Sequence, residues 1–265
     1  SGGVGNNTTG GVWDGTGFCF STSPTPVDSG CFTFIGGGFQ NVASGNCSTV
    51  SGGGRNTASA NYSTVSGGYF NTASGQYSTA SGYYNTASGY ASNVSNGLQN
   101  VASGCYSTIN GGRNNTASNY GSVVVGGYLN TSCSNYSFVG AGNQNTVSGY
   151  CGYSSIVGGF SNTNCFDYAF IGGGACNLIS NDYGVIGGGA NNVVCGVYGT
   201  VNGGRNNTAS GYTSAISGGR FNSSSGQYSA VLAGFCNTVI GSHSGILNGC
   251  CNTAQAPFAY IGGGI

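Results

Sequence analysis

"SGGYFNTASGQYSTA", residues 66–80, is a fifteen-residue unit that recurs along nearly the whole chain. "SGGGRNTASANYSTV" precedes it directly, and "SNGLQNVASGCYSTI" and "NGGRNNTASNYGSVV" begin at residues 95 and 110. Sixteen units align within the 265 residues, and from residue 36 onward thirteen of fifteen have this length, with one of 14 and one of 17 residues. A fixed period of this size indicates a stacked repeat protein.

The columns of this alignment are stricter than the units themselves. The last position is Val or Ile in every unit except one, which has Ala80, and the third is Gly in fifteen of sixteen units. The twelfth position is most often Tyr, as at Tyr62, Tyr77 and Tyr106. The sixth position is Asn in every unit: Asn6, Asn41, Asn56, Asn71, Asn85, Asn100, Asn115, Asn130, Asn145, Asn162, Asn177, Asn192, Asn207, Asn222, Asn237 and Asn252.

The unit is too short for a pair of helices, and each Gly inside a helix would cost about 1 kcal/mol. Short strands of β-branched and small residues, interrupted by Gly and Asn, fit better. We therefore predict an all-β fold, a single β-solenoid of about sixteen coils. In each coil, "NTAS" and "YSTV" are strands, and the Gly-containing segments are corners at which Gly and Asn adopt positive φ.

Stacked coils turn each column into a ladder. We expect the Val/Ile column to fill a narrow interior, opposite columns of Ala, Ser and Gly. The Asn column is expected to be a buried ladder that satisfies backbone groups of the turns and bonds to its own copies in neighbouring coils. With strands about 4.8 Å apart, sixteen coils would form a rod of roughly 75–80 Å. Its stability would come from summed neighbour interfaces.

"NTASGQYSTASG" and "ASGCYSTINGG" resemble the YadA-like head repeat of trimeric autotransporter adhesins, in which Ser-x-Ala-x-Gly precedes a short β segment and Gly at similar spacing. Similar repeats occur in viral and phage fibres. The resemblance covers residues 36–265. It implies a left-handed β-roll, association of three rolls side by side, and an adhesin role. The chain departs from the family in its many Tyr and its twelve Cys, and we expect no coiled-coil stalk or membrane anchor in it.

The composition excludes several function classes. The four Arg and four Asp give zero formal charge, and Lys and Glu do not occur, so no basic field is available to bind nucleic acid. No apolar run is long enough to span a bilayer, and no signal peptide is visible. The chain is nevertheless 38% apolar, with 18 Tyr and 13 Phe, which argues against disorder.

Two pairs of cysteines are candidate disulfides. Cys236 and Cys251 share the fifth position of adjacent coils, so their Cα atoms should be about 5 Å apart, within the disulfide range. Cys19 and Cys31 flank an irregular loop that a disulfide would close. Cys133, Cys165 and Cys195 share a column only in alternate coils, too far apart to bridge, and we expect small buried apolar side chains there. So many Cys suit an extracellular setting.

Catalytic, metal and cofactor sites are not indicated. The single His, His243, lies in the Tyr column, where we expect an aromatic substitute in a stack rather than a general base. Asp167 and Asp182 share the eleventh position of adjacent coils and mark either a cation site or a solvated corner, and we expect the corner. The stacked Arg205 and Arg220 are interpreted in the same way. No Cys-x-x-Cys spacing suggests zinc, and the Gly-rich segments lack the Lys and the helix of a phosphate loop.

Residues 10–34, "GGVWDGTGFCFSTSPTPVDSGCFTF", interrupt the repeat frame. We therefore divide the chain into residues 1–35, a first coil with this inserted loop, and residues 36–265, the repeat array. The ends of a solenoid are open strand edges that need a cap or a partner. The loop, with Trp13, Phe18 and Phe20, is a candidate cap or assembly flap. Both chain ends are in repeat frame, which fits either a segment of a longer protein or head-to-tail growth.

Two surface features leave further alternatives open. Asn-x-Ser/Thr sequons allow glycans, except at Asn6, Asn130 and Asn222, where a buried ladder would exclude them. Thr occupies the seventh column in ten units, often as Thr-x-Ser, and a flat array of hydroxyls is typical of ice-binding solenoids. The simpler interpretation is that Thr suits a solvated strand.

These observations lead to one expected function and two rivals. We expect a structural, self-associating subunit of an extracellular, cell-surface or virion-surface fibre, with other copies of the chain as its partners and without enzymatic activity or cofactor. The rivals are a trimeric adhesin or receptor-binding fibre head and an ice-binding protein.

Overall fold

The structure is a computed structural model that describes residues 3–4, 31–149 and 152–265. The chain divides into two compact units, residues 1–129 and 130–265. Each unit is a parallel β-solenoid, and together they contain about 15 coils. No helix occurs among the described residues, so the predicted fold class is confirmed. Trp13, Phe18, Phe20 and Cys19, the predicted flap and half of a predicted disulfide, lie outside the described residues.

In the first unit, each coil contributes one strand to each of two parallel sheets. One sheet has the order β2 (Phe34–Ile35), β5 (Thr49–Val50), β7 (Thr64–Tyr69), β9 (Thr79–Tyr83), β11 (Asn93–Val94), β13 (Thr108–Ile109) and β15 (Val123–Val124). The other has the order β4 (Val42–Ala43), β6 (Thr57–Ala58), β8 (Thr72–Ala73), β10 (Thr86–Ala87), β12 (Val101–Ala102) and β14 (Thr116–Ala117). β1 (Gly3–Val4) pairs with β3 (Gly38–Phe39).

The second unit is built in the same way. One sheet has the order β17 (Phe138–Val139), β19 (Ser155–Ile156), β21 (Phe170–Ile171), β23 (Val185–Ile186), β25 (Thr200–Val201), β27 (Ala215–Ile216), β29 (Ala230–Val231), β31 (Gly245–Ile246) and β33 (Tyr260–Ile261). The other has the order β16 (Thr131–Ser132), β18 (Thr146–Val147), β20 (Thr163–Asn164), β22 (Leu178–Ile179), β24 (Val193–Val194), β26 (Thr208–Ala209), β28 (Ser223–Ser224), β30 (Thr238–Val239) and β32 (Thr253–Ala254).

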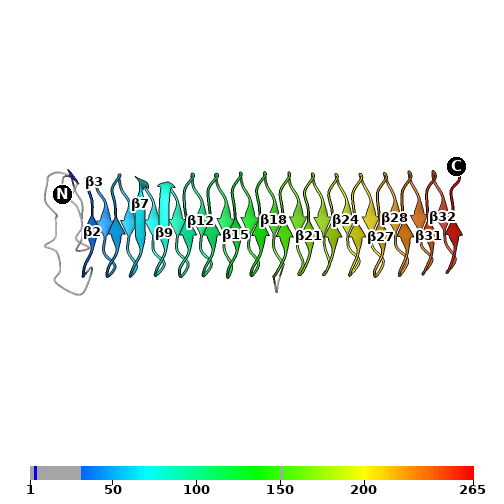
Figure 1. The fold of residues 1–265 in the computed structure, drawn as a ribbon, viewed down its shortest axis with the longest axis horizontal. Coiled ribbons are helices and arrows are strands. Elements are labelled where there is room, and N and C mark those ends of the chain that lie inside the picture. Colours follow the sequence, from blue (N-terminus) through cyan, green and yellow to red (C-terminus); the bar gives the residue numbers. More distant parts are fainter. Residues whose placement is uncertain (1–2, 5–30, 150–151) are drawn as a thin grey trace. The chain divides into compact units, whose positions relative to one another are not determined.

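Register follows the repeat: a residue pairs with its equivalent in the next coil, as Thr57 does with Thr72 and Thr208 with Ser223. Within each unit the strands of neighbouring coils therefore lie side by side (Figure 1). The one-residue deletion in the 14-residue unit is accommodated between β7 and β9, where the pairing register shifts between Val65 and Gly67.

The core is a narrow column inside each unit. The eighth and fifteenth positions of a coil are fully buried, as at Ala73, Val65 and Ile216, and the Ser of the thirteenth position is also buried. Strands are two residues long in most coils, so one side chain of each strand points inward and the other outward. The predicted interior of Val, Ile and small residues is confirmed.

The asparagine ladder is the main polar element of the core, and it is confirmed for the described part of the chain. Asn177 is typical. Its Nδ2 donates to the carbonyls of Gly173 in its own coil and Gly189 in the following coil, both at 3.0 Å. Its Oδ1 accepts the backbone N–H of Asn192 at 3.0 Å, and its own N–H bonds to Asn162 Oδ1 at 3.0 Å. The amide thus closes the turn and links three coils.

Corners contain left-handed backbone at side-chain-bearing residues as well as at Gly. The fifth and twelfth positions adopt φ between 50° and 61°, for example 56° at Arg55 and 59° at Tyr62. Such residues cost about 1–2 kcal/mol each. Each makes a bond to the preceding coil: Arg55 N–H to Phe39 O and Tyr62 N–H to Asn46 O, both at 2.8 Å. The expectation that Gly and Asn carry the positive φ values was therefore incomplete.

Candidate functional site

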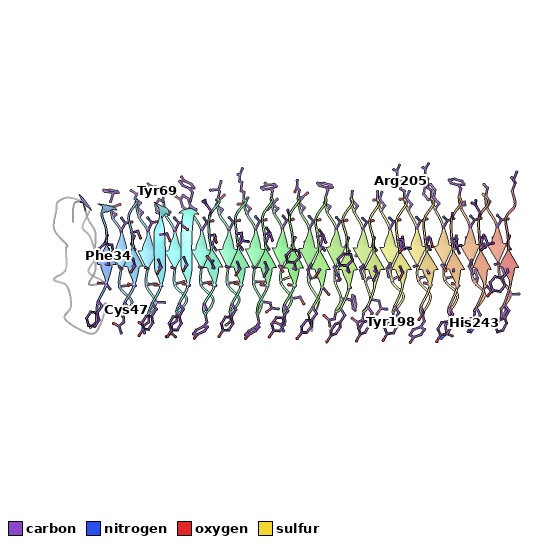
Figure 2. The ribbon with its side chains drawn as sticks, in the orientation of Figure 1. Phe34, Cys47, Tyr69, Tyr198, Arg205 and His243 are labelled. Atoms are coloured by element: carbon purple, nitrogen blue, oxygen red, sulfur yellow. The ribbon has the colours of Figure 1, made fainter. Side chains whose placement is uncertain are left out.

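The interior is filled by buried side chains, so the candidate surfaces are the outward columns, which we name by position. The tyrosine edge comprises the eleventh and twelfth positions, the arginine edge the fourth and fifth, and the hydroxyl face the seventh and ninth. In the first unit, Tyr69 and Cys47 point outward at opposite margins of the ribbon (Figure 2). In the second, Arg205 lies at one margin, and Tyr198 and His243 at the other (Figure 2).

The tyrosine edge of the second unit carries a continuous aromatic stack. Tyr136, Tyr153, Tyr168, Tyr183 and Tyr198 follow one another with ring centroids 4.8–5.4 Å apart and planes within 19° of parallel. The rings are about half exposed, but their faces are covered by one another. Solvent therefore meets ring edges and hydroxyls, and each stacked pair contributes about 0.5–1.5 kcal/mol beyond burial.

His243 continues this edge as predicted. Its ring centroid lies 4.9 Å from that of Tyr228 and 5.2 Å from that of Phe258, with planes 33° and 17° from parallel. The imidazole takes the place of a phenol between two aromatic rings.

In the first unit the tyrosine edge alternates between columns. Tyr62 and Tyr77 stack at 5.0 Å, both at the twelfth position. Tyr90 and Tyr120, at the eleventh position, make edge-to-face contacts with Tyr106 at 5.5 and 5.3 Å. In these two coils the twelfth position, which has positive φ, is occupied by Ala91 and Gly121 rather than by Tyr.

The arginine edge of the first unit contains an aromatic cluster that the sequence reasoning missed. Tyr69, Phe70, Tyr83 and Tyr84 stack in pairs across two coils, at 5.7 and 4.6 Å. In the preceding coil, the Arg55 guanidinium lies 5.1 Å from the Phe70 centroid, and its Nε donates to Gln40 Oε1 at 2.9 Å. The signal was available, because aromatic pairs at the fourth and fifth positions recur one coil apart.

On the arginine edge of the second unit, Arg205 and Arg220 pair in register on adjacent coils and are exposed. The Arg220 guanidinium lies 4.8 Å from the Phe221 centroid, in cation–π contact. The two arginines occupy a solvated corner, as expected.

Asp167 and Asp182 differ from the expectation of a solvated corner. Asp167 is only 9% exposed, and its Oδ1 accepts the N–H of Gly152 at 2.9 Å. Asp182 Oδ1 accepts the N–H of Asp167 at 3.1 Å. Each carboxylate therefore closes the corner of the preceding coil, which is also what the Asn61 amide does for Asn46 at 3.0 Å. The eleventh position therefore has a structural role that depends on contacts between coils.

The cysteines of the described residues are free thiols. Cys133, Cys165 and Cys195 are half-buried rather than buried, since the ninth position faces outward, and the Cys133 thiol donates to Val147 O at 3.2 Å. Cys31 is exposed, and its candidate partner Cys19 is outside the described residues. Cys236 and Cys251 lie at equivalent corners of adjacent coils, so their disulfide stays a prediction. Sequence reasoning overlooked Cys250, whose Sγ is 3.3 Å from that of Cys251.

Asn130 and Asn222 are fully or almost fully buried in the ladder, which leaves no room for a glycan there. Across the described ranges, no group of three His, Cys, Asp or Glu side chains is arranged to hold a metal ion. The described part of the chain also contains no helix long and apolar enough to cross a membrane.

No protein-family model matches this chain, and no curated protein sequence matches it either. The parallel solenoid is therefore established by the structure, while the likeness to adhesin head repeats still rests on the quoted residues.

Proposed function

We propose that the chain is a structural subunit of an extracellular, cell-surface or virion-surface fibre, and that copies associate head to tail by stacking coil upon coil. The observation that supports this most is the interchangeability of the coils. Pairing by one repeat reproduces the same hydrogen bonds throughout each unit, so the upper surface of a coil complements the lower surface of any other. The proposal stacks a second copy through bonds of this same kind.

β32 and β33 are the last strands of their sheets in the described residues, and the proposal places the next copy against them. In the preceding coil, the N–H of Thr238 donates to Asn252 O at 2.8 Å and that of Ile240 to Ala254 O at 2.9 Å. The equivalent donors one coil later belong to Thr253 and Gln255, and they point toward the position of a following coil. Open parallel edges of this kind pair readily with another chain.

The test compares two substitutions at Thr253, whose side chain is exposed. T253P removes the donor and places a ring where the next coil would stack, whereas T253A keeps the N–H. In negative-stain microscopy, we expect the unmodified chain and T253A to form filaments of constant width, and T253P to remain as separate particles. Separate particles of the unmodified chain at high concentration, or bundles of three side by side, would contradict the proposal. The bundles would instead support the trimeric adhesin head.

Ice binding is a second candidate, favoured by the hydroxyl face of the first unit. Thr57, Thr72 and Thr86 are in register on β6, β8 and β10, with Ser59, Ser74 and Ser88 two residues further along. Hydroxyls therefore repeat about every 4.8 Å between coils and about every 6.6 Å along a strand. Such a regular array on a short, flat strand face is suited to ordering water.

Freezing-point hysteresis of the purified chain tests this second candidate. If the hydroxyl face binds ice, T72Y should abolish the hysteresis, because a large ring interrupts the array. T79Y, on the outward position of the other sheet, is the matched control and should retain it. Absence of hysteresis in the unmodified chain excludes this function and leaves the assembly proposal untouched.

A further inference from the structure

We propose that the corner formed by Cys236, Cys250 and Cys251 is an oxidation site. There, a small disulfide such as glutathione disulfide converts Cys236 and Cys251 into a disulfide that joins two neighbouring coils, and Cys250 remains a thiol. This inference concerns chemistry within one chain and does not depend on the proposed assembly.

The backbone holds Cys236 and Cys251 in equivalent positions. Both are the fifth residue of their coils, and both have φ of 58°. Cys251 N–H donates to Phe235 O and Phe235 N–H to Gly249 O, each at 2.9 Å, so the two corners are in register. Neighbouring strands place equivalent Cα atoms about 4.8 Å apart. This distance is within the range of about 4.4–6.8 Å that a disulfide requires.

Cys251 interacts with each of the other two thiols. The neighbouring thiol of Cys251 raises the pKa of Cys236 above its ordinary value. A hydrogen bond with Cys250 is the main cause that raises the pKa of Cys251. Cys236 and Cys251 are exposed and Cys250 is half-buried, so a small disulfide can reach the first two from solvent.

Cys250 is the nearer neighbour of Cys251 but the poorer partner. Their sulfur atoms are 3.3 Å apart, yet consecutive Cα atoms are only about 3.8 Å apart across a trans peptide. That separation is shorter than the Cα distances of ordinary disulfides, so a bond between adjacent cysteines is strained. The cross-coil bond between Cys236 and Cys251 needs no backbone movement and is therefore the favoured product.

The reaction is an ordinary thiol–disulfide exchange. The thiolate of Cys236 or Cys251 attacks one sulfur of the oxidant, forms a mixed disulfide and releases one small thiol. The second cysteine then attacks the protein sulfur of that mixed disulfide and releases the other small thiol. Two protein thiols are oxidised, one disulfide is reduced to two thiols, and the two protons from the protein end on those thiols.

Cys176 provides an internal comparison. It occupies the same fifth position, is exposed and has φ of 55°. Its neighbours in the column are Ser161 and Asn191, so it has no second thiol in register. A mixed disulfide formed there cannot be resolved by a column neighbour.

The experiment treats the full chain with glutathione disulfide, blocks remaining thiols with iodoacetamide, and maps the non-reduced peptides by mass spectrometry. We expect a peptide pair linked through Cys236 and Cys251, alkylated Cys250, and Cys176 either alkylated or carrying glutathione. C250S should leave the linked pair unchanged. C251S should abolish it and leave glutathione on Cys236. Glutathione on all three cysteines without a link, or a link between Cys250 and Cys251, would overturn the proposal.

A second measurement reports the effect on the fold. The linked cysteines enclose one coil, and closing a loop of that size lowers the equilibrium population of the locally opened state by up to about 100-fold. Amide hydrogen exchange in β30 and β32 should therefore slow on oxidation of the unmodified chain and of C250S. It should not slow in C251S. Equal exchange rates in the reduced and oxidised unmodified chain would show that no disulfide forms between the two coils.

Discussion

Replacing Asn177 by alanine is expected to lower the free energy of unfolding by about 3–5 kcal/mol. The substitution removes bonds from Nδ2 to Asn162 Oδ1 and to the carbonyls of Gly173 and Gly189. It also leaves the buried N–H of Asn192 without its acceptor. Alanine cannot replace these bonds. The substitution therefore removes hydrogen bonds that join three coils.

Guanidinium denaturation of the full chain, followed by circular dichroism, measures this effect, and hydrogen exchange locates it in β22 and β24. N202A is the matched control, because Asn202 lies at an exposed first position of a coil in the same unit. It should change stability by less than about 0.5 kcal/mol. A similarly small effect of N177A would mean that the ladder is not what holds the corners closed.

Replacing Gly204 by alanine is expected to cost about 3–6 kcal/mol. Gly204 has φ of +89°, which L-residues rarely adopt, and an added Cβ would lie 2.2 Å from Gly219 O in the next coil. The same Cβ would lie 2.6 Å from Asn207 Nδ2, which bonds to that carbonyl. Both contacts involve groups fixed by the ladder, so the coils must separate to admit the methyl group.

Gly203, one residue earlier, is the matched control for this prediction. An added Cβ there meets nothing within 4 Å. G203A should therefore be neutral or stabilising by up to about 1 kcal/mol, because it restricts only the unfolded chain. Thermal and guanidinium unfolding of the two variants in parallel give the comparison. Equal stabilities of G203A and G204A would refute the close approach of neighbouring coils at the third position.

The ladder, the interior column and the nearly constant Gly of the third position were predictable because every coil imposes the same requirement at that position. In the described coils, the sixth position repeats as Asn for the same reason that Asn177 is buried: only a short amide can serve as donor and acceptor between coils. His243 was also predictable, since its column is aromatic. These inferences needed only the alignment of the chain with itself.

The features that were missed depend on which residues meet across coils. The sequence predicts a solvated corner at Asp167, but its carboxylate accepts an N–H from the preceding coil. Tyr62 and Arg55 carry left-handed backbone that their side-chain types disfavour, because a bond to the preceding coil holds them there. The thiol cluster needed Cys250 and Cys251 of one coil to be placed beside Cys236 of another.

The amino-acid sequence by itself determined the fold class, the period, the interior columns and the asparagine ladder. It did so because a solenoid repeats one set of steric and hydrogen-bonding demands in each coil, and repetition makes them visible. Only the tertiary structure decided the conformations of the corners, the role of the Asp column, the order of the aromatic stacks and the meeting of three thiols. Those depend on contacts between coils about 4.8 Å apart, which bring together residues that are fifteen apart in the chain.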